Sequence, residues 1–239
     1  MNLKITRLTY AIGLFLLLLV AGLGCNNLLP PEPDRLGYQY FPLTLGEFRI
    51  YRVKVINYNL DGTTDTLNYQ LKEVVADTST LGTEISYRLD RFRRTDATQP
   101  WVIDSVWSAR VNTYQAIVVE NNIPIIKLSF PLMENRRWDG NAMNALDFDE
   151  FKIKNLDFTY QMDGTDYPNS LEMFMDDLLD PNKITNDDFH LEIFSKGIGL
   201  IHKLDTVKQY CNPGKCQETG VIEQGKVVDQ KLLQIGNEN

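Results

Sequence analysis

Two of the three cysteines lie close together near the C-terminus, in the segment Cys211-Asn-Pro-Gly-Lys-Cys216. Its Asn-Pro-Gly centre is typical of a turn, which would bring the two thiols together. The pair could form a disulfide, or it could hold a metal together with His202. A structural zinc site needs four ligands and usually a second, closely spaced pair, which this chain lacks. We predict a disulfide, which would contribute about 2 kcal/mol in an oxidising compartment.

No motif identifies a catalytic group, because the chain has neither G-x-S-x-G nor H-E-x-x-H. We interpret His190 as a solvated residue on a strand and His202 as a packed or rim residue. Clustered carboxylates favour calcium over glycosidase chemistry, although acidic loops are normally just solvated. The clusters are Asp147, Asp149 and Glu150; Asp176, Asp177 and Asp180; and Asp187 and Asp188. We predict no catalytic residue, no metal site and no cofactor.

The first 24 residues have the pattern of a secretory signal peptide. Lys4 and Arg7 are their only charged side chains, and an uncharged, largely apolar run extends from Leu8 to Gly24. A basic start, a short apolar core and small residues before a boundary define such a peptide. A membrane-spanning helix needs about 20 apolar residues, more than this core provides. Export would supply the oxidising compartment for the cysteine pair.

The boundary Ala21-Gly22-Leu23-Gly24-Cys25 resembles a bacterial lipobox, with Gly22 where that pattern usually has Leu. The resemblance implies that Cys25 receives a diacylglyceryl thioether with fatty acyl chains such as palmitate and becomes the new N-terminus. Two or more acyl chains anchor a protein stably. Asn26 follows in place of the Asp of the inner-membrane retention signal, so we expect the outer membrane.

The organisation that follows is a tether and one domain. Pro30, Pro31 and Pro33 oppose helix and remove backbone donors, which predicts an extended, lipidated tether over residues 25–36. The remaining residues, 37–239, have no long or compositionally biased linker, and this length fits one all-β domain.

Apolar and polar residues alternate with a period of two in several segments, which is typical of strands with one wet face. In the segment around residue 191, Phe189, Leu191 and Ile193 alternate with His190 and Glu192. Turn dipeptides Asp61-Gly62, Asp163-Gly164 and Asn121-Asn122 separate such segments. Short connections favour antiparallel neighbours, so we predict about nine to eleven strands in one sheet, with few or no helices after the signal peptide. So many strands must close toward a half-barrel, barrel or sandwich.

Residues 170–179 fit two patterns. Leu171, Phe174, Met175, Leu178 and Leu179 have the spacing of an amphipathic helix, with Ser170 as a possible N-cap. Leu171, Met173 and Met175 also alternate as in a strand. The spacing alone favours a helix, whereas the surrounding strands favour a strand.

Three short segments are similar to Bacteroidota lipoproteins of unknown function. These are the opening at Tyr40–Tyr51 with its aromatic-Pro-Leu and Gly, Trp138-Asp-Gly-Asn141, and the late Gly197-Ile-Gly-Leu200 signature. The resemblance implies a curved antiparallel sheet and a strand at Leu171–Asp176, and it carries no catalytic residues. Gly197 and Gly199 themselves predict a bulge or tight bend, because the further residues of a phosphate loop are missing.

The formal net charge of −8 argues against nucleic acid as a partner. We expect a lipoprotein of the bacterial envelope, bound to the membrane through its N-terminal anchor, with a non-catalytic binding or structural role. Its candidate ligand is a lipid or another apolar small molecule, or an envelope protein. The alternatives are a secreted hydrolase acting on glycan or lipid, and an accessory subunit of an envelope complex.

Overall fold

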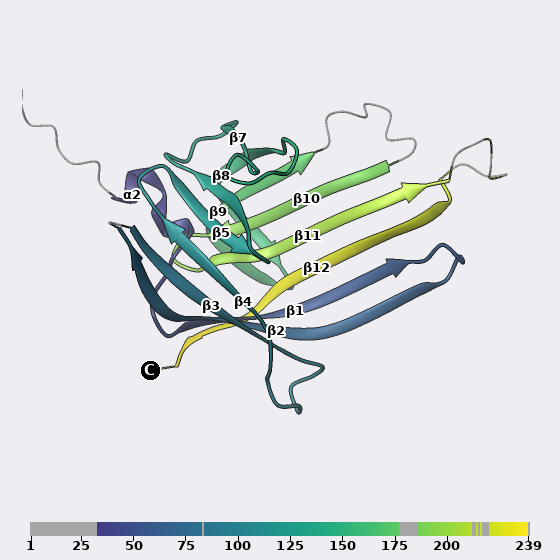
Figure 1. Ribbon diagram of the computed structural model, residues 1–239, viewed down its shortest axis with the longest axis horizontal. Helices are drawn as coiled ribbons and strands as arrows, with labels where there is room; N and C mark the ends of the chain where they lie inside the picture. Colours follow the sequence, from purple (N-terminus) through teal and green to yellow (C-terminus); the bar gives the residue numbers. More distant parts are fainter. Residues whose placement is uncertain are drawn as a thin grey trace, which may run out of the picture. The chain divides into compact units, whose positions relative to one another are not determined.

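The computed structural model describes residues 33–82, 84–176, 186–211, 214, 216 and 220–238. The predicted signal peptide and Cys25 lie outside these ranges. Almost all of the described chain is antiparallel β-structure in one sheet of twelve strands (Figure 1). The strands are β1 Glu47–Tyr58, β2 Thr64–Leu81, β3 Glu84–Arg94, β4 Val102–Val111, β5 Gln115–Glu120, β6 Ile123–Ser129, β7 Arg137–Asp139, β8 Glu150–Met162, β9 Thr165–Asp176, β10 Asn186–Ser195, β11 Gly199–Tyr210 and β12 Ile222–Asn237. The predicted fold class is confirmed, and the short β7 is the strand that the sequence pattern did not indicate.

The strand order follows the chain around the whole sheet. From one edge to the other it is β6-β5-β4-β3-β2-β1-β12-β11-β10-β9-β8-β7. One meander consists of β1 to β6 and the other of β7 to β12. They are joined by the pairing of β1 with β12, in which Glu47 lies opposite Asn237. Hairpin connections keep the neighbours antiparallel, as the short gaps in the sequence predicted.

The two edge strands meet and bring the sheet close to a closed barrel. The Ile126 N–H in β6 donates to the Gly140 carbonyl just after β7, at 2.9 Å. The Trp138 indole N–H in β7 donates to the Ile126 carbonyl at 2.8 Å. Of the three closures expected from the strand count, the sheet adopts the barrel-like one.

Two of the three predicted turn dipeptides have two consecutive positive φ values, whereas in Asp61-Gly62 only Gly62 does, at 81°. Asn121 and Asn122 both have positive φ, 51° and 68°, and connect β5 to β6. Asp163 and Gly164, with φ 50° and 80°, connect β8 to β9 in the same way. Two consecutive residues with positive φ match the right-handed twist of the flanking strands, and Asn, Asp and Gly adopt that conformation most readily.

The structure decides between helix and strand at one segment and differs from the prediction at another. Residues 170–176 form part of β9, so the strand alternative is confirmed there, while 177–179 lie outside the described ranges. Pro33–Leu36, expected to belong to the extended tether, form the short helix α2. Proline is tolerated in the first turn of a helix because that N–H has no intrahelical partner. No helix among the described residues is long and apolar enough to span a membrane.

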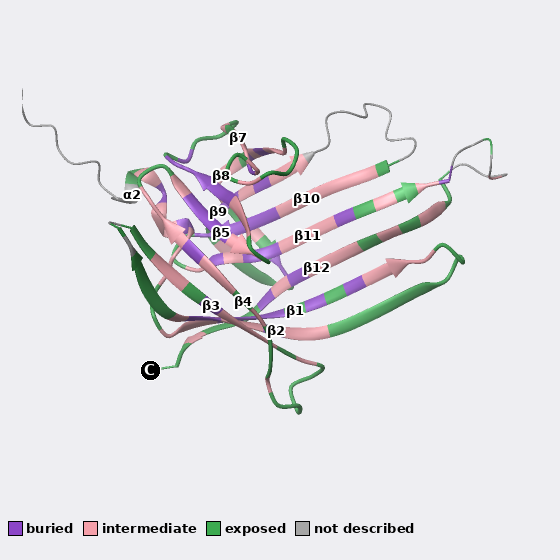
Figure 2. Ribbon diagram, in the orientation of Figure 1, coloured by how far each residue is buried: buried purple, intermediate pink, exposed green. Residues whose placement is uncertain are grey.

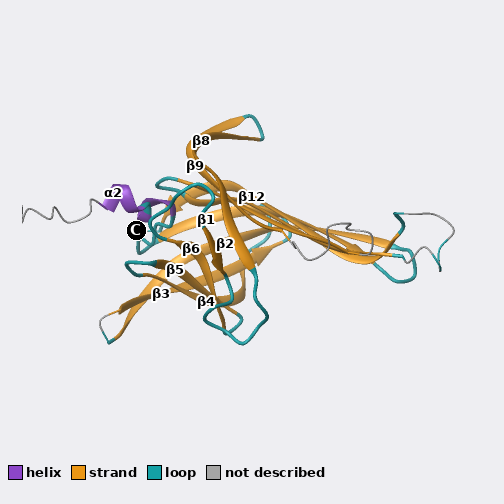
Figure 3. Cartoon of the chain, turned by 90° about the horizontal axis from the view of Figure 1, so that it is seen from above, coloured by secondary structure: helices purple, strands orange, loops and turns teal. Residues whose placement is uncertain are grey.

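The chain before β1 fills part of the interior of the curved sheet. The 3-10 turn η1, Tyr38–Tyr40, leads into a core cluster in which Tyr40 is 3% exposed. Its partners come from strands far apart in the sequence, including Leu128, Phe151 and Phe194. Figure 2 shows buried residues gathered where the strands curl around this segment, and exposed residues toward the far ends of β2, β10 and β11. In Figure 3, the long strands including β1, β2 and β12 extend away from that end.

The tip of the β8–β9 hairpin covers a second face of the sheet. Pairing between β9 and β10 is limited to Ser170–Asp176 of β9, so the rest of the hairpin is free to bend away. Its Met162 packs with Ile193 of β10 and Ile201 of β11 in one buried cluster. Arg52 of β1 binds Asp163 in the turn at 2.7 Å. Strand β10 is therefore covered on both faces from Glu192 onward, and His190 is partly buried, which corrects the expectation of a wet face at these two residues.

Candidate functional site

A cavity of about 110 Å³ lies inside the curl of the sheet, lined by residues of β1 to β6 and β10 to β12. Part of its wall is apolar and comes from both the strands and the segment before β1. The apolar lining consists of Phe41, Pro42, Leu43, Leu89, Val118, Phe194 and Leu200. Phe41, Leu43 and Trp107 pack against the buried cluster that contains Leu89 and Val118. The volume of the whole cavity is somewhat below that of an engineered apolar cavity of about 150 Å³ that binds benzene.

The other part of the wall is charged, which is unusual for a protein interior. Its side chains are Arg49, Glu73, Arg91, Glu120, Lys127, Glu192 and Lys203. Four are cations and three are anions, so the lining carries one net positive charge in a chain whose formal net charge is −8. Buried charges require partners because transfer out of water is costly.

Lys127 holds two carboxylates together across the interior. Its Nζ lies 2.9 Å from Glu120 Oε1 and 2.9 Å from Glu192 Oε1, which joins β6 to the distant strand β10. Burial alone would lower the pKa of Lys127, but the two carboxylates raise it above its ordinary value. Burial alone would raise the pKa of Glu120, but Lys127 and Lys203 lower it. Lys127 and Glu120 are thus both ionised at neutral pH.

Arg91 and Trp107 stack on each other in the charged part of the cavity wall. The Arg91 guanidinium lies over the Trp107 ring, 3.4 Å from its centre, and 3.4 Å from Glu73 Oε2 through Nε. Arg91 Nε and Trp107 Nε1 are both buried, and neither has a hydrogen-bond acceptor. Stacking of a guanidinium on an aromatic ring uses its face and leaves its N–H edge available.

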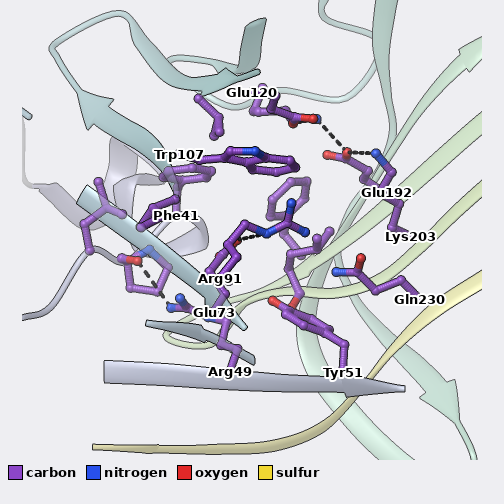
Figure 4. A pocket seen from close by; sticks show the side chains of 18 residues that line it. Phe41, Arg49, Tyr51, Glu73, Arg91, Trp107, Glu120, Glu192, Lys203 and Gln230 are labelled. Atoms are coloured by element: carbon purple, nitrogen blue, oxygen red, sulfur yellow. Dashed lines mark hydrogen bonds and ion pairs between the residues drawn. The ribbon is translucent and has the colours of Figure 1, made fainter. Parts of the chain in front are cut away.

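Glu192 contributes an acceptor atom that is likewise buried and makes no hydrogen bond. Its side chain is 3% exposed, and Oε2 is buried with no hydrogen-bond partner, while Oε1 binds Lys127. In Figure 4, the Glu192 carboxylate, the Arg91 guanidinium and the Gln230 amide lie around one central space beneath Trp107. An unsatisfied buried polar atom costs about 1–3 kcal/mol, so this space is suited to a bound polar group.

Arg49 is fully engaged at the edge of the cavity. Its Nε donates to the Ile198 carbonyl at 2.6 Å, and its Nη2 donates to the Pro42 carbonyl and to Glu47. Gly199 permits this contact, because it has φ +88° and an added Cβ would lie 3.2 Å from Arg49 Nε. The bend predicted at the Gly-Ile-Gly segment is confirmed, and it positions Arg49 as a structural cation.

The cysteines and histidines singled out in the sequence do not line this cavity. Cys211 and Cys216 form the predicted disulfide, with Cα atoms 6.0 Å apart. His202 is buried, as predicted, between Tyr160 and Asp229, at 2.6 and 2.8 Å. His190 is not the solvated residue that we predicted, because its ring binds Asp205 at 3.0 Å and Asp188 at 2.6 Å.

The predicted carboxylate clusters do not make a metal site within the described ranges, where no group of three His, Cys, Asp or Glu side chains could hold an ion. Asp147 is exposed, whereas Asp149 and Glu150 are partly buried. Asp177 and Asp180 lie outside the ranges that the structure describes. The carboxylates that do converge are Glu73, Glu120 and Glu192 in the cavity.

A signal for two of the missed cavity residues is present in the sequence. Glu73 continues the apolar side of the Leu67-Tyr69-Leu71 alternation, and Arg91 continues that of Ile85-Tyr87-Leu89. A charge in phase with the buried side of a strand indicates a lined interior. Lys127 gives no such signal, because it stands within a continuous apolar run.

The arrangement is suited to binding. Glycoside hydrolysis needs one protonated carboxyl as general acid. Glu120 is kept ionised, and Glu73 and Glu192 each face a cation at 3.4 and 2.9 Å. What remains available is a set of unpaired hydrogen-bonding atoms beside an apolar wall, which is the usual composition of a ligand pocket.

No protein-family model and no curated protein matches the sequence. Among solved structures, the chain is similar to a protein described as exported, with a YmcC-like fold, from Bacteroides fragilis (13% identity, TM-score 0.44, covering 82% of this chain and 98% of that one). It is also similar to a protein described as a lipoprotein from Parabacteroides distasonis (12% identity, TM-score 0.38, 81% and 98% covered). A third is described as an outer membrane lipoprotein-sorting protein domain from Vibrio parahaemolyticus (11% identity, TM-score 0.20, 81% and 86% covered).

Proposed function

We propose that this chain is a lipid-anchored protein of the bacterial envelope whose β domain binds a small ligand without chemical conversion. Cys25 at the end of the apolar N-terminal run carries the anchor, and the Asn at position 26 favours the outer membrane. The Pro-containing segment before residue 37 separates the domain from the bilayer.

One observation supports the binding role above the others. The interior cavity combines an apolar wall with three buried polar atoms that make no hydrogen bond: Arg91 Nε, Trp107 Nε1 and Glu192 Oε2. Folded proteins rarely leave such atoms unpaired unless a ligand or water completes them. A volume of about 110 Å³ is too small for a complete phospholipid, so the proposed ligand is a small molecule.

Native mass spectrometry of the full-length protein, purified from its producing cells in detergent, tests both halves of the proposal. We expect a covalent chain of residues 25–239 plus a diacylglyceryl group and fatty acyl mass, because processing ends at Cys25. We also expect a small non-covalent adduct that is lost on collisional activation. A chain that starts elsewhere or has no lipid mass would contradict the anchor, and a lipidated chain with no adduct would contradict the binding role.

A pair of leucines provides the control. Leu43 lines the cavity, whereas Leu45 is 45% exposed two residues away. Leu43→Trp fills the cavity from a segment outside the sheet and should abolish the adduct. Leu45→Trp adds the same volume at the surface and should leave the adduct intact.

A further inference from the structure

The cavity atoms that make no hydrogen bond are two donors and one acceptor, and this combination constrains the ligand. Arg91 Nε and Trp107 Nε1 are donors, and they lie together because the guanidinium stacks on the indole ring. Glu192 Oε2 is an acceptor on β10, a strand that is not adjacent to β3 or β4 in the sheet. A complementary ligand therefore presents acceptors on one side and a donor on the other.

The charge of the lining favours an anion on the donor side. Three of the four lining cations bind an acceptor at 3.0 Å or less. Arg49 binds two carbonyls and Glu47, Lys127 binds Glu120 and Glu192, and Lys203 binds Asp205 at 3.0 Å. Arg91 is the remaining cation: it forms an ion pair with Glu73 at 3.4 Å, but its Nε makes no hydrogen bond in that contact. A planar guanidinium fork matches the two oxygens of a carboxylate, and the apolar wall beside it fits the body of an organic acid.

The size and the apolar wall limit the rest of the molecule. A cavity of about 110 Å³ limits the whole ligand, carboxylate included, to about the size of benzene. Leu89, Val118 and Phe41 would contact a short branched aliphatic or small aromatic group there.

We propose that the cavity binds a small carboxylic acid with a hydroxyl or ammonium group next to the carboxylate. The carboxylate accepts hydrogen bonds from Arg91 and the Trp107 indole N–H, and the neighbouring donor binds Glu192 Oε2. This assignment rests on the proposed binding function and names its ligand class.

The test uses four matched compounds and the indole signals of the full-length protein in detergent micelles. The chain has three tryptophans, so ¹⁵N-labelled indole groups give three N–H signals, and Trp107→Phe assigns the one from the cavity. We expect 2-hydroxyisovalerate or valine to shift the Trp107 signal with saturation. Isovalerate, which lacks the donor, should bind at least tenfold more weakly, and the neutral isovaleramide should not shift the signal.

Variants assign the two ends of the ligand. Arg91→Gln should weaken the best acid at least tenfold, and Arg91→Lys, which keeps the charge and loses the fork, should also weaken it if the first variant does not fold. Glu192→Gln should remove the advantage of the hydroxy or amino acid over isovalerate. Arg94→Gln is the control, because Arg94 also stacks on a tryptophan, Trp101 at 4.1 Å, but does not line the cavity.

The outcomes separate this assignment from the proposed function. Binding of isovaleramide as tight as that of the acids, or equal loss in the Arg94 and Arg91 variants, would overturn the carboxylate assignment. A native adduct from the cell that proves neutral would overturn it too, while the binding function would stand. No adduct and no shift with any of the four compounds would overturn both.

Discussion

Lys127 illustrates how a buried charge can position another residue rather than add stability. A buried ion pair gains little net stability, because the Coulomb attraction mainly offsets desolvation. The Lys127 contact at 2.9 Å nevertheless fixes one oxygen of Glu192, which leaves the other oxygen as an unpaired acceptor facing the cavity. The ion pair therefore defines the orientation of the group that we propose contacts the ligand.

The two histidines should titrate on opposite sides of the ordinary value of 6.5. Burial alone would lower the pKa of His190, but Asp205 and Asp188 raise it on balance. Burial lowers the pKa of His202 and outweighs the opposing effect of Asp229. In the same cluster, His190 and Lys203 offset burial and lower the pKa of Asp205 to about 2. A ¹H NMR titration should show one imidazole above 6.5 and one below, with His190→Gln removing the higher.

The signs of the stability effects follow from linkage. His202 is more basic in the unfolded chain, so its contribution is present at neutral pH and is lost as the pH falls below 6.5. The contribution of His190 is present below 6.5 and is lost as the pH rises through its higher folded pKa. Urea unfolding of His202→Gln should therefore show less loss between pH 7 and pH 5 than the unaltered protein. An equal loss would contradict the assignment.

Residue-level prediction from the sequence was partly successful, for identifiable reasons. Paired cysteines around a turn are a local signal, and they form the disulfide. Glu192 was assigned to a wet face because its neighbours Leu191 and Ile193 are apolar. That assignment was wrong because Glu192 faces the interior, where it binds Lys127, while the β8–β9 hairpin covers the Leu191 side. Both are long-range contacts that alternation cannot reveal.

At the scale of elements, the start of β11 depends on a glycine that contacts the first strand. Gly199→Ala should reduce the free energy of unfolding by about 1–2 kcal/mol from the left-handed φ alone. The added Cβ would also crowd Arg49 and Pro42, at 3.2–3.3 Å, so the total should be larger. Gly197→Ala is the control, because Gly197 also has a positive φ but nothing lies within 4 Å of an added Cβ. Urea denaturation that gave equal losses would show that the close contact is unimportant.

Elements with strong local turn chemistry were predictable, and those defined by distant packing were not. Asn121-Asn122 and Asp163-Gly164 form their hairpins because these residues tolerate positive φ. Residues 170–176 satisfied two periodicities, and pairing with β8 and β10 selects the strand. The three-residue β7 has no periodicity to detect, and it forms because Trp138 and its neighbours meet β8 and β6.

At the scale of the whole molecule, anchoring depends on one cysteine. Cys25→Ser should lose incorporation of labelled palmitate and leave the membrane fraction, because no other residue is proposed to carry lipid. The double variant Cys211→Ser and Cys216→Ser should keep both label and location. Cell fractionation with palmitate labelling measures both, and a Cys25 variant that remains labelled would refute the lipoprotein assignment.

The circular strand order has a consequence for how the chain folds. Each meander is made of contacts between consecutive strands, which form rapidly because little chain must be closed. The exception is β12, which must reach back to β1, pairing Tyr58 with Gly225 and Glu47 with Asn237. The sheet cannot close until its last sixteen-residue strand has emerged from the ribosome. An incomplete chain therefore remains open, which is the state in which a polypeptide can still be threaded across a membrane.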